Sequence, residues 1–429
     1  MTINKIRSLF LDNLTSNQTI YKNSFWLMLA EIISKVPIFF LNLWIVRYLG
    51  AQAYGQFSFV FAFCALFATL TDLGLSTLII RDIAKNKHQI KKYLDNLLVL
   101  KLILGLITFA VIFVAIQFMG KSPEIEFAVY MVAIFTIAIS LVAFFQSVFQ
   151  AFEKMEYLAL SKVIYSASLL TLIILIIWQK GQVTSLVGGY VYSALITLIS
   201  VLIFVRKRFT KFLFEIDLNF WKKIISQAWS FGLIGILSSM YIQIAVIQIN
   251  LILNDFETGI YNVAYQFIFV FMTLINIFIC SLFPTLSKEY QKSKVKFYRM
   301  LSFFSQRIII ISLIFCLVVA IFSEKLILFL YGHDYLGSVV ILRVLLVANF
   351  FLVINQICLL ALSIARRQKQ YLKPLFIGVV TMSLLNYPLI FIWGGLGASL
   401  SAVVSSIVIA MMITKKFVIF RKNDLMSAS

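Results

Sequence analysis

Long apolar runs separated by short polar connectors dominate the chain from residue 22 to residue 420. A membrane-spanning helix needs about 20 apolar residues in a row, whereas the strands of outer-membrane barrels alternate apolar and polar positions over about ten. The runs follow the helical pattern, so they predict an all-α integral membrane protein of twelve spans. We expect spans near 22–48, 53–80, 94–118, 125–150, 157–178, 183–205, 222–253, 257–287, 300–322, 336–363, 371–393 and 395–420.

Composition supports the same class. Of the 429 residues, 62% are hydrophobic and 13% are charged, and the mean hydropathy of +0.99 is too high for a water-soluble domain. The four cysteines lie far apart in predicted spans, and the two histidines lie in different connectors. We therefore expect no disulfide framework, no metal site and no cofactor.

Positive charge is distributed unevenly between the connectors. Of the 37 Lys and Arg residues, 29 lie on one alternating set of connectors and 4 on the other. Because positive charge is retained on the cytoplasmic side, both termini are expected in the cytoplasm. Topology and anionic lipid headgroups then account for the net charge of +20, and no nucleic-acid partner is expected.

A weak internal repeat divides the spans into six and six. A shift of 204 residues aligns "LGAQAYGQFSFVFAF" (49–63) with "LNDFETGIYNVAYQF" (253–267) and matches Gly55 to Gly259. Halves with an even number of spans insert in the same orientation, which predicts two pseudo-symmetric lobes of an alternating-access transporter. The expected organisation is a cytoplasmic N-terminal segment (1–21), an N-lobe (22–205), a cytoplasmic linker (206–221), a C-lobe (222–420) and a cytoplasmic tail (421–429).

Four basic residues lie about seven or more residues inside predicted spans, where a charge costs roughly 2.5–3.5 kcal/mol. Lys35 is the deepest, because it lies about twelve residues from either end of its span, farther than a side chain reaches. Lys101 and Arg307 are each close enough to a cytoplasmic helix end for snorkelling, and Arg343 is similarly close to an external end. All four are candidates for binding the anionic part of a substrate.

Acidic residues and one proline complete the set of candidates. Glu31 precedes Lys35 by one helical turn, so the two form either a structural ion pair or a cation held ready for an anionic substrate. Glu31 and Asp72 are candidates for coupling to a proton or a sodium ion. Pro37 removes a helical hydrogen bond and predicts a hinge beside the charged pair.

Neutral polar residues form stripes on spans of both halves. Such residues either hold helices together, at about 0.6 kcal/mol per contact, or line a shared central cavity. One face of the span near 222–253 also carries Gly232, Gly235 and Ser239. The candidate cavity residues are Asn42, Gln243, Asn250, Asn262, Gln266, Asn349 and Gln356.

Three segments carry a resemblance to a known family. They are "RYLGAQAYGQFSFVFAF" (47–63), "TDLGLSTLIIRDIAK" (71–85) and "QSVFQAFEKMEYLA" (146–159). In this order they resemble the polysaccharide-transport flippases, which move O-antigen and capsule repeat units and belong to the multidrug/oligosaccharidyl-lipid/polysaccharide exporter superfamily. With twelve spans and both termini in the cytoplasm, the resemblance covers the whole chain.

The resemblance implies a V-shaped pair of lobes around a cationic cavity. It also implies that the substrate is a polyprenyl-diphosphate-linked oligosaccharide, carried from the cytoplasmic to the outer leaflet of a bacterial inner membrane for a polymerase and chain-length machinery. Physical chemistry agrees, since a diphosphate cannot cross hydrocarbon without counter-charge. The candidate cavity amides named above would then contact sugar hydroxyls. Membrane lipids surround the transporter, and an ion gradient is the expected energy source because no phosphate-binding G-x-x-x-x-G-K-[ST] loop is present.

Three other functions compete with this hypothesis. A multidrug extrusion antiporter of the same fold would favour acidic over cationic residues in its lobes, because its substrates are typically cations. A membrane polymerase or glycosyltransferase would need a large external loop or converging carboxylates, and the longest external connector (323–336) is short. A fourteen-helix peptidoglycan-precursor flippase would need two more spans. We therefore expect a transporter that is not an enzyme.

Overall fold

The computed structural model describes residues 16–209 and 213–426, with side chains from residue 31 onward except 228, 230 and 231. Parts of the predicted N-terminal segment (1–15), linker (210–212) and tail (427–429) lie outside the described residues. Every regular element in the described ranges is helical, as expected where lipid offers the backbone no hydrogen bonds. The long helices are α2 (Ser16–Ala68), α3 (Leu75–Lys85), α4 (Ile90–Gln117), α5 (Pro123–Ala151), α6 (Met155–Trp178), α7 (Val183–Arg208), α8 (Leu218–Ile252), α9 (Asp255–Lys292), α10 (Lys294–Leu330), α11 (Ser338–Ile364), α12 (Leu372–Trp393) and α13 (Gly395–Met426).

Within the described ranges, eleven segments are long and apolar enough to cross a membrane. One of them, Glu31–Lys85, contains most of the first two predicted spans. No loop separates these two spans. The chain changes direction at a single residue, Gly50, where α2 has a non-helical backbone with φ of 69°. Glycine adopts this left-handed backbone without the clash that a Cβ would cause. The prediction of an all-α, many-span membrane protein is confirmed.

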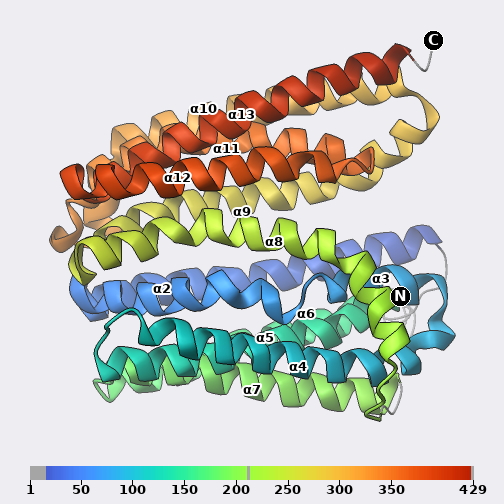
Figure 1. Ribbon diagram of the computed structural model, residues 1–429, viewed down its shortest axis with the longest axis horizontal. Helices are drawn as coiled ribbons and strands as arrows, with labels where there is room; N and C mark the ends of the chain where they lie inside the picture. Colours follow the sequence, from blue (N-terminus) through green and yellow to red (C-terminus); the bar gives the residue numbers. More distant parts are fainter. Residues whose placement is uncertain (1–15, 210–212, 427–429) are drawn as a thin grey trace, which may run out of the picture. The chain divides into compact units, whose positions relative to one another are not determined.

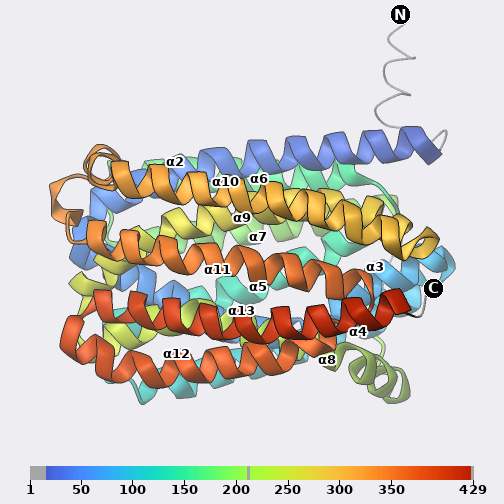
Figure 2. The same cartoon turned by 90° about the horizontal axis from the view of Figure 1, so that it is seen from above.

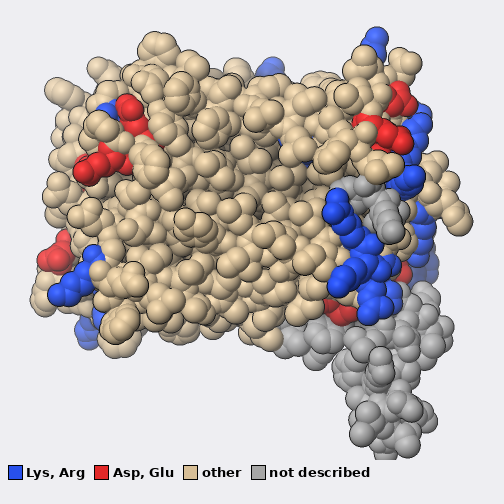
Figure 3. All heavy atoms as spheres, turned by 90° about the horizontal axis from the view of Figure 1, so that it is seen from below, with Lys and Arg blue, Asp and Glu red and all other residues tan. Residues whose placement is uncertain are grey.

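The surface has the charge pattern of a membrane protein. On the face in Figure 3, charged side chains lie toward the two ends of the helices, and a wide band of uncharged side chains separates them. Large apolar side chains are strongly exposed, for example Leu106 at 70% and Ile321 at 71%. Exposure on this scale is stable only against hydrocarbon, so these side chains face lipid.

The chain forms two compact units that do not coincide with its linear halves. Unit 1 consists of Met1–Leu49 and Phe63–Ser239, and unit 2 of Gly50–Ala62 and Met240–Ser429. Helices α2 and α8 therefore contribute residues to both units. Each unit includes a segment that the sequence assigned to the other lobe.

Unit 1 is organised around α5, which packs against α3, α4 and α7 (Figure 1). Its core at one end of the helices is rich in aromatic side chains, with Phe144, Phe145 and Phe149 of α5 fully buried against Leu94 and Leu97 of α4. Aromatic side chains bury large areas and interlock by edge-to-face contacts. This core positions α4 and α5 rigidly beside the polar groups described below.

Unit 2 is organised around α11 and α13. Helix α11 packs against α9, α10 and α13, and α12 packs along α13 (Figure 2). Ala398, Ser401, Ala402 and Ser405 on α13 are buried and small, which lets the neighbouring helix backbones approach closely. Within unit 2 these contacts depend on packing and hydrogen bonding, because lipid supplies no hydrophobic drive between helices.

The two glycines matched by the repeat meet in unit 2. A Cβ on Gly55 would lie 1.7 Å from the carbonyl oxygen of Asp255, and a Cβ on Gly259 would lie 2.1 Å from that of Ala51. The same shift of 204 residues relates Ala51 to Asp255, so the two contacts are equivalent by the repeat. Asn262 also donates to Ser58, its own counterpart, over 2.7 Å. The part of α2 beyond Gly50 and the start of α9 therefore cross in close contact within unit 2.

This crossing predicts that Gly259→Ala destabilises the protein. The added methyl would overlap a carbonyl oxygen of packed backbone, and overpacking of this kind costs about 1–3 kcal/mol. Thermal unfolding in detergent measures the loss. Gly188→Ala is the matched control, because its Cβ would meet only the flexible end of Met131 at 3.3 Å. Equal melting temperatures for the two variants would contradict the close crossing.

Candidate functional site

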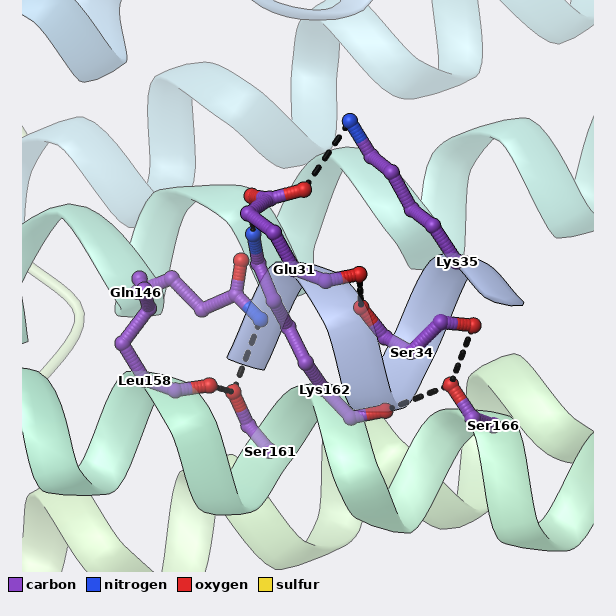
Figure 4. Close-up of polar contacts among 8 residues, drawn as sticks. All are labelled: Glu31, Ser34, Lys35, Gln146, Leu158, Ser161, Lys162 and Ser166. Carbon is purple, nitrogen blue, oxygen red and sulfur yellow. Dashed lines mark hydrogen bonds and ion pairs between the residues drawn. The ribbon is translucent and has the colours of Figure 1, made fainter. Parts of the chain in front are cut away.

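One carboxylate and two ammonium groups meet in unit 1 between α2 and α6 (Figure 4). Glu31 Oε2 lies 2.9 Å from Nζ of Lys35, and its other oxygen accepts a hydrogen bond from Nζ of Lys162. The side chain of Lys35 is 52% exposed, while those of Glu31 and Lys162 are each 26% exposed. The cluster carries a net charge of +1, and we call these three residues the lysine cluster.

Small polar side chains fix the helices beneath the lysine cluster. Ser166 Oγ of α6 shares its hydrogen bond between the carbonyl oxygens of Lys162 (3.0 Å) and Ser34 (3.3 Å), so it links α6 to α2 (Figure 4). Gln146 of α5 donates to Ser161 Oγ of α6 over 2.8 Å. Ser34, Ser161 and Ser166 are buried. These contacts hold the backbones that present the charges, so the geometry of the cluster is preorganised.

Lys162 is the residue that the sequence reasoning missed. It lies within α6, and its ammonium reaches Glu31. The available signal was its position between Ser161 and Ser166, which continue a polar stripe into an apolar span. Since Glu31 is shared by two lysines, its single charge cannot neutralise both.

The lysine cluster has the chemistry of an anion site. A phosphate oxygen that approaches Lys35 meets a partly exposed cation, and the carboxylate that is paired with it is already bonded to Lys162. Charge-assisted hydrogen bonds of this kind contribute about 1.5–3 kcal/mol each. In the absence of an anion, Glu31 is ion-paired with both lysines, so each cation has a carboxylate beside it even though the cluster keeps a net charge of +1.

A second ion pair in unit 1 joins Asp72 and Lys101. Asp72 lies at a break between the 3₁₀ turn η1 (Thr69–Thr71) and α3, where Leu73 and Gly74 have positive φ of 47° and 84°. It accepts hydrogen bonds from Lys101 Nζ and from Ser76 Oγ, the latter over 2.6 Å. The Lys101 side chain is 1% exposed and lies 5.5 Å from the centroid of the Phe144 ring.

This pair changes the interpretation of both residues. Lys101 does not snorkel toward a helix end, because it is buried and its ammonium contacts a carboxylate. The pair is neutral as a whole, so it offers no excess charge to an anionic substrate. Its position at a helix break is typical of ion sites in membrane transporters, where discontinuous helices free backbone groups.

The remaining candidates on α2 have local roles. Asn42 accepts a hydrogen bond from Tyr190 Oη over 3.4 Å. The backbone stays helical at Pro37, and the interruption of α2 lies at Gly50. A hinge at Pro37 therefore stays a prediction.

The predicted sugar contacts on α9 bind other side chains in unit 2. Asn262 and Gln266 donate to the hydroxyl of Tyr54 over 3.0 and 2.6 Å, and Tyr331 donates to Gln266 over 2.9 Å. Tyr54 is 3% exposed. This network holds α2, α9 and the end of α10 together, so its amides already have partners inside the protein.

The other candidates in unit 2 are dispersed. Asn250 donates to Asp255 and Thr258, Asn349 is buried and donates to Cys316 Sγ, and Gln243 and Gln356 are half-buried. Arg343 is exposed on α11 and donates to Ser323 Oγ over 2.9 Å. Arg307 is exposed on α10, with its guanidinium 3.2 Å from the centroid of the Phe303 ring. Within unit 2 these residues do not form one cluster.

A further amide network in unit 2 escaped the sequence reasoning. Asn386 of α12 donates to Gln248 of α8 over 2.6 Å and accepts a hydrogen bond from Ser401 of α13. Asn386 and Ser401 are buried. Single polar residues in three separate spans carry no local signal of this meeting. Among the described residues, no group of three His, Cys, Asp or Glu side chains is arranged to hold a metal ion.

The protein is all-helical and has many helices long and apolar enough to span a membrane. It is similar to a multidrug resistance MATE family transporter of the MOP superfamily in the inward-facing conformation, with 16% identity, a TM-score of 0.73, and coverage of 93% of this chain and 100% of that chain. The protein is also similar to the lipid II flippase MurJ in an inward closed conformation, with 14% identity and a TM-score of 0.75. This match covers 94% of this chain and 90% of that chain.

A third solved structure has the same fold. It is a MOP superfamily transporter from Pyrococcus furiosus, for which the reverse polarity of the binding pocket suggests a different function. It is 16% identical, with a TM-score of 0.66 and coverage of 97% of this chain and 98% of that chain. At these identities the three likenesses concern the fold alone.

The family follows from the sequence itself. A family model described as "Polysaccharide biosynthesis protein" matches residues 20–290, which is more than half of the chain. The chain therefore belongs to the polysaccharide biosynthesis protein family, and the family resemblance expected from the sequence is confirmed. A comparison with curated proteins gives no match.

Proposed function

We propose that this protein is a flippase for a polyprenyl-diphosphate-linked oligosaccharide, as used for O-antigen or a related surface polysaccharide. It carries the repeat unit from the cytoplasmic to the outer leaflet of a bacterial inner membrane, with both termini in the cytoplasm. The protein is not an enzyme in this proposal, since the covalent structure of its substrate is unchanged. A polymerase and its chain-length machinery then use the product.

The lysine cluster carries the proposal. A diphosphate is the most costly part of such a substrate to move through hydrocarbon, because buried charge without counter-charge is prohibitive. Lys35 and Lys162 supply two cations, and Glu31 is the exchangeable counter-ion that holds them between transport events. The lipid tail stays in the bilayer while the charged head passes the site.

Family and fold support the same substrate class. Members of this family are described by polysaccharide biosynthesis, and one structure with this fold is a lipid II flippase. An ion gradient is the proposed energy source. Asp72 at the helix break and Glu31 in the lysine cluster are the proposed sites for a proton or a sodium ion.

A multidrug extrusion antiporter is the second candidate, because two of the similar folds are transporters of the same superfamily and one is a multidrug resistance protein. The net positive charge of the lysine cluster argues against a cationic drug as the substrate, since like charges repel in a low-dielectric environment. Neutral or anionic drugs would be compatible with the site.

Transport by purified protein in proteoliposomes tests the proposal. A fluorescent, short-chain polyprenyl-diphosphate oligosaccharide is placed in both leaflets, and a membrane-impermeant quencher reports the outer pool over time. We expect protein-dependent exchange that accelerates with a proton or sodium gradient. Extrusion of a cationic dye without movement of the lipid would contradict the proposal and support the antiporter.

A further inference from the structure

A second charged pocket lies in unit 2, at the end of the helices where α13 finishes. It has a volume of about 480 Å³ and lies between the first four turns of α10 and the last two turns of α13. Arg299, Ser302 and Gln306 line it from α10 at helical spacing, together with Tyr298, and Arg421 lines it from α13. We call it the arginine pocket.

Within the described part of the chain, the two arginines of the pocket have no carboxylate partner. The nearby carboxylate of Asp424 accepts hydrogen bonds from Tyr298 (2.9 Å), Tyr290 (3.2 Å) and Lys294 (3.2 Å). Among the described residues, the ion pairs include neither Arg299 nor Arg421. The Arg421 guanidinium lies 5.5 Å from the centroid of the Tyr298 ring, which orients it without removing its charge.

The polar atoms of the pocket suit a phosphate group. A guanidinium presents paired N–H donors that match two phosphate oxygens, and it is more weakly hydrated than an ammonium. The hydroxyl of Ser302 and the amide of Gln306 add neutral donors on the same helix face. Arg307 extends the basic edge, because it stacks on Phe303, which lines the pocket.

The lengths of the two helices place the pocket at headgroup level. Helix α10 has 37 residues and α13 has 32, whereas about 20 residues cross the hydrocarbon core. The pocket takes its residues from the outermost turns of both helices. Lipid-facing side chains of α10 begin just beyond it, with Ile310, Ile311 and Ile314 each 55% exposed. A phosphate in the pocket would continue directly into hydrocarbon chains along this apolar face.

We propose that the arginine pocket binds the headgroup of an anionic phospholipid, with Arg299 and Arg421 on the phosphate and the acyl chains along α10 past Ile310. Basic pockets between membrane helices are known to bind such headgroups. The site is separate from the lysine cluster and does not depend on the proposed substrate. An anionic phospholipid would then be a ligand of unit 2, and its occupancy would depend on the lipid composition of the membrane.

Native mass spectrometry of the purified full-length protein tests this inference. The protein in detergent is titrated with phosphatidylglycerol or with phosphatidylcholine of the same acyl chains. The wild type is expected to bind the anionic lipid more tightly, and the variant Arg299→Gln/Arg421→Gln to lose roughly tenfold or more of that affinity. Lys292→Ala/Lys422→Ala is the matched control, since it removes two exposed charges of the same end outside the pocket and should retain the affinity.

Three results would overturn the inference. Equal losses in the arginine variant and the lysine control would indicate diffuse surface charge in place of a site. Displacement of the lipid by inorganic phosphate or glycerol phosphate at similar concentrations would indicate a site for a soluble anion. An arginine variant that is folded and binds phosphatidylglycerol like the wild type would exclude the pocket. The single variant Arg421→Glu repeats the test if the double variant does not elute as a single species.

Discussion

Lys35→Ala is expected to slow translocation of the lipid-linked oligosaccharide about ten- to hundredfold, since one charge-assisted hydrogen bond to the diphosphate contributes about 1.5–3 kcal/mol. Glu31 keeps Lys162 as its partner in this variant, so the carboxylate is not left unpaired. Lys35→Arg retains the positive charge and should keep most of the rate. The measurement is the initial rate of lipid exchange in proteoliposomes at low substrate concentration.

Lys92→Ala is the matched control for this experiment. Lys92 also belongs to unit 1, its side chain is 57% exposed, and it is ion-paired, with its Nζ 3.6 Å from Asp217. It differs from Lys35 because it lies in the first turn of α4, at a helix end where charge is solvated. If Lys35→Ala and Lys92→Ala transport at the same rate as the wild type, the Glu31–Lys35 pair is structural and the cationic site must be sought elsewhere.

Asp72→Ala is expected to destabilise the folded protein by about 3–5 kcal/mol, because it leaves the buried ammonium of Lys101 without its partner. Lys101 has no route to water, since its side chain is 1% exposed and packs beside the Phe144 ring. The loss of the hydrogen bond from Ser76 would also loosen the break before α3. Thermal unfolding of the purified protein in detergent measures the effect.

The double variant Asp72→Ala/Lys101→Met separates the lost pair from the orphaned charge. Replacing both partners of a buried pair by apolar residues is often neutral or stabilising, so this variant should recover most of the stability. Transport by the recovered protein then reports whether the pair takes part in ion coupling. An Asp72→Ala variant that melts like the wild type would contradict the burial of Lys101.

The internal repeat predicted a close helix crossing, although the two repeated segments have few identical residues. The match of Gly55 to Gly259 identified two positions at which backbones touch. Gly55 lies against the carbonyl oxygen of Asp255 and Gly259 against that of Ala51, and the same shift relates Ala51 to Asp255. Apolar run length predicted the spans because lipid imposes it directly. The two compact units differ from the linear halves of the chain, since α2 and α8 each contribute residues to both, and the two-lobe organisation stays a prediction.

The candidate site was only partly predictable. Helical spacing indicates which residues share a face, and it paired Glu31 with Lys35. It cannot indicate which other helix supplies a partner, so the contacts of Lys162 with Glu31 and of Lys101 with Asp72 were not foreseen. For the same reason amides such as Asn262 and Gln266, predicted to bind sugar, bind Tyr54 of a distant segment.

The central claim is that the lysine cluster binds diphosphate, and binding to the purified protein tests it most directly. A short-chain polyprenyl diphosphate is titrated against the wild type and against Glu31→Gln/Lys35→Gln/Lys162→Gln, which removes the net charge of the cluster without orphaning a charge. The corresponding monophosphate is the control ligand. The account predicts that the wild type prefers the diphosphate and that the neutral variant loses this preference. Undiminished, diphosphate-selective binding by the folded neutral variant would contradict it.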